Sequence, residues 1–362
     1  MGKEEQEAEV LLLQMMRRWS RERLHDTRRS SPDEVDQLLQ EAADLGLHLL
    51  TFPETAGGFG LAPAQLPVWV EALSSGDPAL ALRVALQAGP VATLWPAEEE
   101  GSWAAYLRVD GTPDQSSFSI SAGEEGLVLS GELSRCLCSE SDRVLVLLER
   151  EAAYLISLDE ARVEREQESP IGLERAGWVR LKVQHAPARR LSVSAAQLQS
   201  AWAWDQLVWA TLATSIGREA SAEGLRYAEE RSQFGKALTQ FQAIQWMLAD
   251  SDAELSAVEL LIGEAISALA DASGSLRGAR LAAEARLLSA DAAHQACDRA
   301  LQIHGGYGYT KDYAVELLWR ASLCCEEQLS RERLSRQICE ALRGEGGDVE
   351  PARGKSEASS PP

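Results

Sequence analysis

The sequence predicts a mainly α-helical α+β protein with an N-terminal helical domain, a small middle β-domain and a C-terminal four-helix bundle. Two observations lead to this fold class. Apolar residues recur at helical spacing in the two outer parts of the chain, whereas the middle part holds short β-rich runs separated by turns. The expected domains are residues 1–105, 106–200 and 201–342, and the Gly-, Ser-, Pro- and charge-rich tail, 343–362, is expected to be disordered.

The N-terminal part is expected to be all helical. A charged amphipathic helix is predicted over residues 3–28. Ser31, followed by a proline suited to a first turn, can cap a second helix that Gly46 ends. Two further helices are predicted, over residues 63–73 and 78–88.

The middle part predicts a β-domain. Its candidate strands are short, rich in β-branched and aromatic residues, and separated by glycine-containing turns. They are Ser117–Ser121, Leu127–Ser130, Arg143–Leu148, Tyr154–Leu158 and Val179–Val183.

The C-terminal part predicts long helices with short connections, the pattern of an antiparallel bundle. Leu323–Leu342 contains no glycine or proline and is therefore expected to be one unbroken helix. The four helical segments are Trp204–Gln233, Thr239–Ala272, Leu276–Ile303 and Asp312–Leu342.

Composition limits the classes of function. A chain of 362 residues can bury a large core, and its net charge of −21 argues against binding nucleic acid. No run reaches the roughly eighteen apolar residues of a membrane span, and the charged start, MGKEEQEAEV, lacks a signal-peptide core, so the cytoplasm is expected. The six cysteines lack zinc-ligand spacing, so plain thiols and no metal site are expected.

Two C-terminal segments carry most of the functional information: Arg231–Gln245, RSQFGKALTQFQAIQ, and Gln302–Tyr309, QIHGGYGY. The first joins an arginine and an aromatic residue to a glycine turn and a new helix. The second ends an Ala-rich helix with a glutamine and a glycine pair. A guanidinium and bare backbone near helix ends can hold a pyrophosphate. A helical hairpin between the two segments could bring them together.

Together with Leu45–Gly60, LGLHLLTFPETAGGFG, these segments resemble three motifs of the acyl-CoA dehydrogenase family, in the family order and at roughly the family spacing. The resemblance spans about residues 5–342. It implies the family's fold, with FAD as the cofactor and α,β-desaturation of an acyl-CoA thioester as the reaction. Electron-transfer flavoprotein or oxygen would be the electron acceptor.

In the family, FAD lies across the interface of two subunits. The resemblance implies that one subunit holds the flavin ring while the other holds the ADP half. An arginine can give a pyrophosphate two charge-assisted hydrogen bonds, and glycines let the backbone approach it closely. The residues of this chain that match the ADP-side motifs are Arg231, Gln233, Phe234, Gln242, Gln302, Gly305 and Gly306.

The family's catalytic base is missing from its usual place. A carboxylate normally stands in a Tyr-Glu-Gly-Thr loop that follows an Arg-Asp pair. Here Arg320 is followed by Ala321, and the base position falls on Leu329. Glu326 and Glu327 are near in sequence but are expected to be surface carboxylates of a helix.

Some family members place the base at the start of the helix that leads to the Arg-x-x-Phe motif. That position is Asp205 in this chain, which makes Asp205 the best candidate base. An ordinary carboxylate near the N-terminal end of a helix explains Asp205 equally well.

The motifs of the β-domain have also diverged. The family segment T-E-P-x-x-G-S-D has no counterpart in Tyr106–Ser117, and only Gly131 remains of N-G-x-K-x-W-I-T-N. These losses fall on groups that would serve the chain's own flavin and substrate, whereas the retained motifs would serve a flavin held mainly by a neighbour.

Three interpretations follow. The first is a subunit of a heteromeric acyl-CoA dehydrogenase in fatty acid or steroid catabolism, assembled with a catalytic paralogue as an α2β2 tetramer. The second is a self-sufficient homo-oligomeric flavoenzyme that uses Asp205 or a shifted glutamate as its base. The third is a scaffold or binding protein that has kept the fold without redox chemistry.

Overall fold

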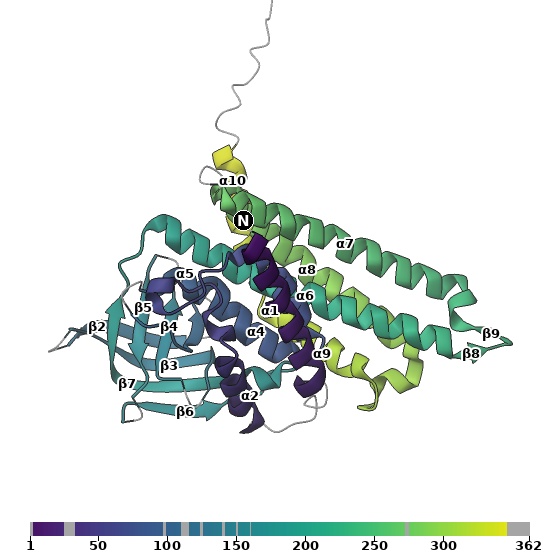
Figure 1. Ribbon diagram of the computed structural model, residues 1–362, viewed down its shortest axis with the longest axis horizontal. Helices are drawn as coiled ribbons and strands as arrows, with labels where there is room; N and C mark the ends of the chain where they lie inside the picture. The colour runs from purple at the N-terminus through teal and green to yellow at the C-terminus, as the bar shows by residue number, and fades with distance from the viewer. Residues whose placement is uncertain are drawn as a thin grey trace, which may run out of the picture.

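The computed structural model shows three parts side by side: a β-sheet at one end, helices from the N-terminal part in the middle, and a bundle of long helices at the other end (Figure 1). This arrangement confirms the predicted mainly helical α+β class. The residues that the structure describes are 3–24, 33–96, 99–109, 116–123, 126–139, 142–149, 151–159, 161–271 and 275–345.

The N-terminal helices pack their apolar faces into the main hydrophobic core, which also includes residues of the bundle. Gly46 ends the second helix in the left-handed region, with φ of 75°, as the sequence suggested. The predicted cap at Ser31 lies outside the described residues. The helices are α1 Lys3–Trp19, η1 Ser20–Leu24, α2 Asp33–Asp44, η3 Leu47–Leu49, η4 Glu54–Ala56, η5 Pro63–Gln65, α3 Leu66–Ser74, α4 Pro78–Leu86, η6 Gln87–Val91 and α5 Ala92–Leu94.

The middle part forms a seven-stranded sheet in the order β2-β3-β1-β4-β5-β7-β6. Because β3 also pairs with β7, the strands between them close into a ring, and a second hydrophobic core fills its interior. The sequence prediction missed two strands, β1 and β6. The strands are β1 Ala105–Arg108, β2 Ser116–Gly123, β3 Gly126–Leu137, β4 Val144–Leu148, β5 Ala153–Ser157, β6 Val163–Gln167 and β7 Trp178–Arg190.

Five helices, rather than four, follow the sheet in the described part of the chain. The first begins earlier than predicted because Ser194 and Gln197 form a capping box ahead of it. It runs through the centre of the molecule, and its buried stretch packs on the N-terminal helices (Figure 1). The helices are α6 Ala195–Glu230, α7 Gln242–Ala270, α8 Ser275–His304, α9 Ala314–Glu327 and α10 Arg331–Glu345.

The prediction that Leu323–Leu342 is one helix was wrong. The chain leaves helical geometry at Gln328–Ser330, between α9 and α10. In a continuous helix the carbonyl of Gln328 would accept a hydrogen bond from the backbone four residues on. Here it accepts one from Nη2 of Arg108 instead, at 3.0 Å. A contact with the β-domain thus breaks a segment whose own sequence favours helix.

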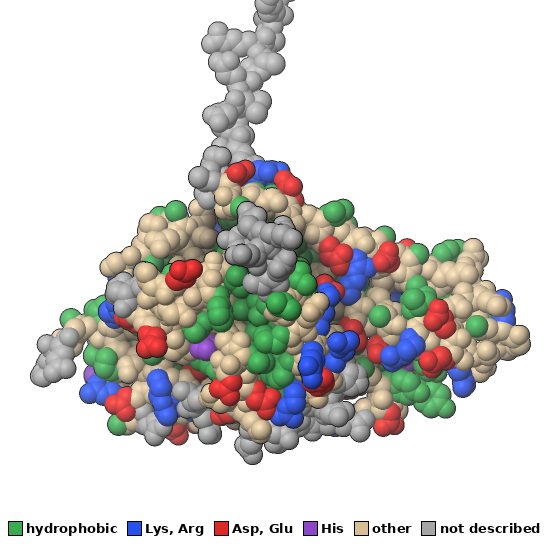
Figure 2. Space-filling model, in the orientation of Figure 1, with side chains coloured by type: hydrophobic (Ala, Val, Ile, Leu, Met, Phe, Trp, Pro, Cys, Tyr) green, Lys and Arg blue, Asp and Glu red, His purple; other side chains and the backbone are tan. Residues whose placement is uncertain are grey.

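The molecule presents different surfaces over its middle and over the bundle. On the face shown in Figure 2, hydrophobic side chains gather over the N-terminal helices, whereas charged side chains of both signs are scattered over the bundle. Within the described part of the chain, no helix has the length and apolar character needed to cross a membrane.

Candidate functional site

The two C-terminal motifs meet at the end of the bundle that is farthest from the sheet (Figure 1). α6 ends, α7 begins and α8 ends there. The ring of Tyr227, in the last turn of α6, stacks on the ring of His304, the last residue of α8, with centroids 4.2 Å apart. Tyr313 packs edge-on against both rings, at 5.8 and 5.3 Å. This aromatic cluster ties the arginine motif to the glycine motif.

The arginine motif forms a small hairpin at this end. Strands β8 Ser232–Gln233 and β9 Lys236–Ala237 pair across Phe234 and Gly235, whose φ angles of 53° and 81° define the turn. The hairpin leads through η8 Leu238–Gln240 into α7. Phe234 is 93% exposed, so the turn holds a large apolar ring in solvent, where a ligand or another subunit could cover it.

Several groups suited to an anion surround this hairpin. Arg231 is exposed, and its guanidinium has no ion-pair partner among the described residues. Gln233 and Gln242 are also exposed. The 29-residue helix α7 begins at Gln242 without a side-chain cap, so the N–H groups of its first two residues lack helical acceptors, whereas those of Ile244 and Gln245 donate to the carbonyl of Phe241. The guanidinium, the amides and the helix N-terminus can together donate to a pyrophosphate.

The glycine motif leaves its backbone open at the same end. It forms η9 Gly305–Tyr309, directly after Gln302 and the end of α8. Gly305 has φ of 58°, which favours glycine, and a Cβ built on Gly305 or on Gly306 would meet nothing within 4 Å. A Cβ on Gly308, in contrast, would lie 3.1 Å from the carbonyl oxygen of Leu301. Gly308 therefore serves packing, whereas Gly305 and Gly306 leave room for a ligand to approach.

The surroundings of Asp205, at the centre of the molecule, are buried, whereas the two motifs at the end of the bundle are exposed. Asp205 of α6 is completely buried, and its carboxylate accepts hydrogen bonds from the hydroxyl of Tyr106, at 3.0 Å, and from Nη1 of Arg108. Arg108 also donates to the carbonyl of Gln328. The two places where the family keeps its base, Asp205 and the turn that contains Leu329, are therefore joined by one arginine.

Large side chains fill the space around this ion pair. The cavity beside Asp205 measures about 30 Å3, and Trp178 and Trp209, whose ring centroids lie 6.4 Å apart, are among the residues that line it. Small-molecule sites usually enclose roughly 300–1,000 Å3. Burial raises the pKa of the Tyr106 hydroxyl above its usual range, and the charge of Asp205 raises it further, so Tyr106 stays a neutral donor.

The remaining candidate carboxylates lie on the surface, as expected. Glu326 and Glu327 are both exposed at the end of α9. Glu327 pairs with Arg135 of the sheet, with 2.5 Å between Nη2 and Oε1. Neither carboxylate lines the cavity beside Asp205.

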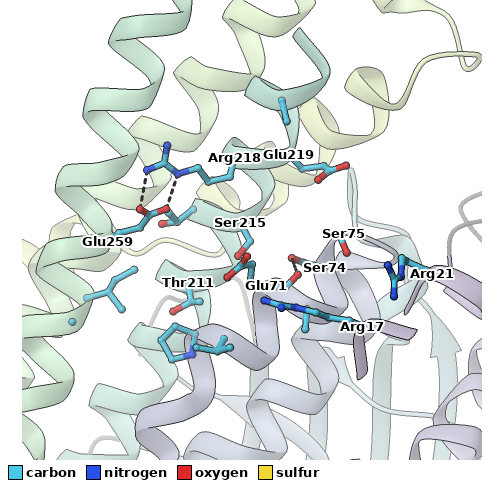
Figure 3. A pocket seen from close by; sticks show the side chains of 17 residues that line it. Arg17, Arg21, Glu71, Ser74, Ser75, Thr211, Ser215, Arg218, Glu219 and Glu259 are labelled. Atoms are coloured by element: carbon cyan, nitrogen blue, oxygen red, sulfur yellow. Dashed lines mark hydrogen bonds and ion pairs between the residues drawn. The ribbon is translucent and has the colours of Figure 1, made fainter. Parts of the chain in front are cut away.

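A wider cavity of about 790 Å3 lies elsewhere, between α1, α3, α6 and α7 (Figure 3). Arg218 spans one side of it and binds the carboxylate of Glu259 at 2.6 Å. Thr211 points a buried hydroxyl without a hydrogen-bond partner toward the cavity. None of the residues singled out from the sequence lines this cavity.

Sequence reasoning also missed Tyr106 and Arg108, the partners of Asp205. The available signal was weak: an arginine ending a four-residue apolar run, Ala105–Arg108. A charged residue in a short buried strand calls for a buried partner, but the sequence gives no direct indication of a partner 97 residues away.

The two outer parts of the chain match one protein family. Residues 4–104 match the N-terminal domain of acyl-CoA dehydrogenases, and residues 196–327 match their C-terminal domain. Together with the motifs and the fold, these matches show that the chain belongs to the acyl-CoA dehydrogenase family.

Relatives of the chain act on several CoA thioesters, according to their names. The chain is 37% identical over 111 residues to the caffeyl-CoA reductase-Etf complex subunit CarC of Acetobacterium woodii, covering 31% of this chain and 28% of that protein. It is 36% identical over 143 residues to 3-sulfinopropanoyl-CoA desulfinase of Paraburkholderia xenovorans, covering 39% and 36%. The matches thus cover only 28% and 36% of the length of these two curated relatives.

Solved structures resemble the whole chain. Butyryl-CoA dehydrogenase from Megasphaera elsdenii superposes with a TM-score of 0.79 at 18% identity, over 95% of this chain and 99% of that one. The FAD complex of PigA superposes with a TM-score of 0.80 at 17% identity, over 94% and 98%. At these identities the likeness establishes the fold.

Proposed function

We propose that this chain is a subunit of a heteromeric FAD-dependent acyl-CoA dehydrogenase. It contributes contacts to the ADP half of an FAD that is held mainly by a catalytic paralogue, and it carries no working base of its own. The paralogue supplies the base, the flavin-ring contacts and the acyl-CoA pocket. Two such pairs would form an α2β2 tetramer.

The observation that carries this proposal is the filled centre. Proton abstraction needs a carboxylate within hydrogen-bond reach of the substrate's α-carbon, in a site that admits the thioester. Asp205 is already bound by Tyr106 and Arg108, and about 30 Å3 is left beside it. We infer that Asp205 holds the β-domain against α6 rather than acting as a base.

The open end of the bundle supports a role toward a neighbour's cofactor. The residues there fit a pyrophosphate: an exposed Arg231, exposed Gln242 and Gln302, and the unobstructed backbone of Gly305 and Gly306. When bound, FAD would supply the hydride acceptor of the desaturation. This chain's residues would hold the phosphates and cover the adenine side, with Phe234 offering an apolar surface.

Substrate and electron acceptor follow from the family at the level of class. The substrate would be an acyl-CoA thioester, of a fatty acid or a bulkier steroid side chain. One relative is named as a subunit of an Etf complex, which supports electron-transfer flavoprotein as the acceptor.

The test is the visible flavin absorbance of this chain, purified alone and then co-expressed with a paralogous acyl-CoA dehydrogenase. We expect colour and acyl-CoA-dependent bleaching only in the co-expressed complex. A yellow protein from this chain alone, bleached by acyl-CoA, would instead support the homo-oligomeric enzyme with Asp205 as its base. Complexes that never bind flavin would support the scaffold.

A further inference from the structure

The cavity between α1, α3, α6 and α7 has the size of a small-molecule site (Figure 3). It measures about 790 Å3, and sites for organic ligands usually enclose roughly 300–1,000 Å3. Much of its wall is apolar, with Val68 and Ala72 contributed by α3 and Ile262 by α7. It shares no residue with the ADP-side motifs or with the cavity beside Asp205. The cavity is therefore a separate candidate site.

One wall of this cavity is left without a side chain. Gly263 lies inside α7 and lines the cavity. Glycine within a helix is less stable than alanine. A Cβ built on Gly263 would meet nothing within 4 Å, so the packing of the described residues does not require glycine there. What the missing side chain does provide is space in the cavity.

Two arginines bring positive charge to the α1 side of the cavity. Arg17 of α1 and Arg21 of η1 both line the cavity, and both are exposed. Neither forms an ion pair with another residue that the structure describes. Figure 3 shows Arg17 reaching into the cavity. Both guanidiniums are therefore available to an anion.

The carboxylates that line the cavity do not balance these arginines. Glu259 is bound to Arg218, at 2.6 Å, and Glu219 has an interaction of its own. Among the lining carboxylates Glu71 alone remains, so two guanidiniums face one carboxylate. The net charge on the α1 side is positive, which favours a ligand with one negative charge.

The floor of the cavity offers a buried hydroxyl. Thr211 of α6 is 4% exposed, and its Oγ1 has no hydrogen-bond partner among the described residues. Thr214, three residues later, shows how a helical threonine is usually satisfied, because its hydroxyl donates to the carbonyl of Ala210 at 2.8 Å. The Thr211 hydroxyl makes no such bond and remains available to an oxygen of a ligand.

We propose that this cavity binds a medium-chain fatty acid in its ionised form. Arg17 and Arg21 hold the carboxylate, whose two oxygens match the fork of a guanidinium. The Thr211 hydroxyl provides a further donor, and the apolar chain is buried against Val68 and Ile262. Because the cavity shares no residue with the ADP-side motifs, this binding does not depend on a role toward a partner's flavin.

The test measures the binding of dodecanoate to the full chain by isothermal titration calorimetry, below the concentration at which dodecanoate forms micelles. Dodecyltrimethylammonium has the same chain and the opposite charge, so it should bind at least about tenfold more weakly. Arg17→Met and Arg21→Met should each weaken dodecanoate binding about 3- to 10-fold. Arg18→Met is the control, because Arg18 pairs with Glu22 and does not line the cavity. It should bind dodecanoate as wild type does.

Gly263→Phe tests the cavity itself. It places a ring in the space beside α7 and should weaken dodecanoate binding more than about tenfold, while the chain stays folded because Gly263 has no packing role. Gly263→Ala adds only a methyl group and should keep wild-type binding. This pair remains decisive if an arginine variant does not fold.

Anomalous diffraction from crystals grown with ω-bromododecanoate gives a second, independent measurement. A bromine peak inside the cavity, among its apolar lining residues, is expected. A peak only outside the cavity would overturn the proposal. So would equal binding of dodecanoate and its ammonium analogue, wild-type binding by both Arg17→Met and Arg21→Met, or wild-type binding by Gly263→Phe.

Discussion

The centre of the molecule and the far end of the bundle hold the positions that match two parts of the family's site, and the two regions are built in opposite ways. At the centre, Asp205 is bound in an ion pair with Arg108, and the cavity beside it, which Trp178 and Trp209 help to line, measures about 30 Å3. At the far end, the arginine and glycine motifs stand open to solvent, with groups that can donate to a phosphate. The first region is built like a core and the second like half of a binding site.

This difference supports the proposal that the chain keeps the family's architecture without a working catalytic centre of its own. Filling a catalytic cavity with a buried ion pair and aromatic rings adds packing to the fold. The open end has no comparable value for stability, since exposed residues such as Phe234 gain little from their positions. Retention of its motifs is therefore better explained by a partner or a ligand than by folding.

The largest effect is expected at the centre. Asp205→Ala removes the buried carboxylate that accepts hydrogen bonds from Arg108 and Tyr106, and leaves the partly buried guanidinium of Arg108 without this carboxylate. We expect a loss of about 3–5 kcal/mol in the free energy of unfolding, measured by urea denaturation.

A surface ion pair on the bundle provides the matched control. Glu254→Ala removes the partner of Arg299, and it should cost no more than about 1 kcal/mol because this pair is solvent-exposed. If Asp205→Ala left stability unchanged but abolished turnover in the complex, Asp205 would be a base and the contrast between the two regions would fail.

The second effect belongs to the open end. Arg231→Ala removes a charge-assisted donor to the flavin's phosphates, so the complex should retain FAD about 10- to 100-fold more weakly, while the unfolding free energy of this chain stays the same. Equilibrium dialysis of the co-expressed complex measures the retention. Arg226→Ala, one turn earlier on α6, is the control and should keep wild-type flavin content. Unchanged flavin content in Arg231→Ala would reject the proposed contact between Arg231 and the phosphates of FAD.

Much of the fold could be predicted from the sequence, because the long helices and the longer strands have clear periodicity. The break at Gln328–Ser330 could not, since it depends on a hydrogen bond from Arg108, 220 residues away in the chain. Strand β1 escaped prediction for a related reason: four residues, Ala105–Arg108, are too few to show alternation.

The open end and the centre also differ in how far they could be predicted from the sequence. The open end consists of contiguous motifs, so Arg231 and Gly305 could be recognised in the sequence as members of a candidate site. The centre is assembled from Tyr106 and Arg108 of β1, Asp205 of α6 and Gln328 of the turn after α9, which are three elements far apart in the chain. Asp205 could therefore be identified as a candidate from the resemblance, whereas its ion pair could be recognised only in three dimensions.

A smaller effect should distinguish a residue that positions the two motifs of the open end from the residues that are proposed to contact FAD. Tyr227→Ala removes the ring that stacks on His304 and so loosens the link between the two motifs. We expect the free energy of unfolding to fall by about 1–2 kcal/mol and the complex to retain FAD more weakly, although Tyr227 is not among the residues that match the ADP-side motifs. Tyr227→Phe keeps the ring and should behave like wild type in both measurements. Equal losses in both variants would mean that the hydroxyl, rather than the stack, is what matters.

The smallest effect concerns pH at the same cluster. Burial lowers the pKa of His304 below 6.5, its ordinary value, so the folded protein holds this imidazole neutral. The unfolded chain therefore binds a proton at a higher pH than the folded chain does. The stabilising contribution is complete above pH 6.5 and declines as the pH falls toward the folded-state pKa.

His304→Phe isolates this contribution, because it keeps a ring against Tyr227 but removes the titrating group. The pKa of the half-buried His48 is also lowered by burial, but His48 is present in both proteins, so its effect cancels when the two are compared. Urea denaturation at a series of pH values below 7 should show wild type losing more stability on acidification than His304→Phe. Parallel curves would mean that the end of the bundle admits enough water to solvate a charged imidazole. In that case this end would be open through to the aromatic cluster itself, and the stack could not serve as the rigid link between the two motifs.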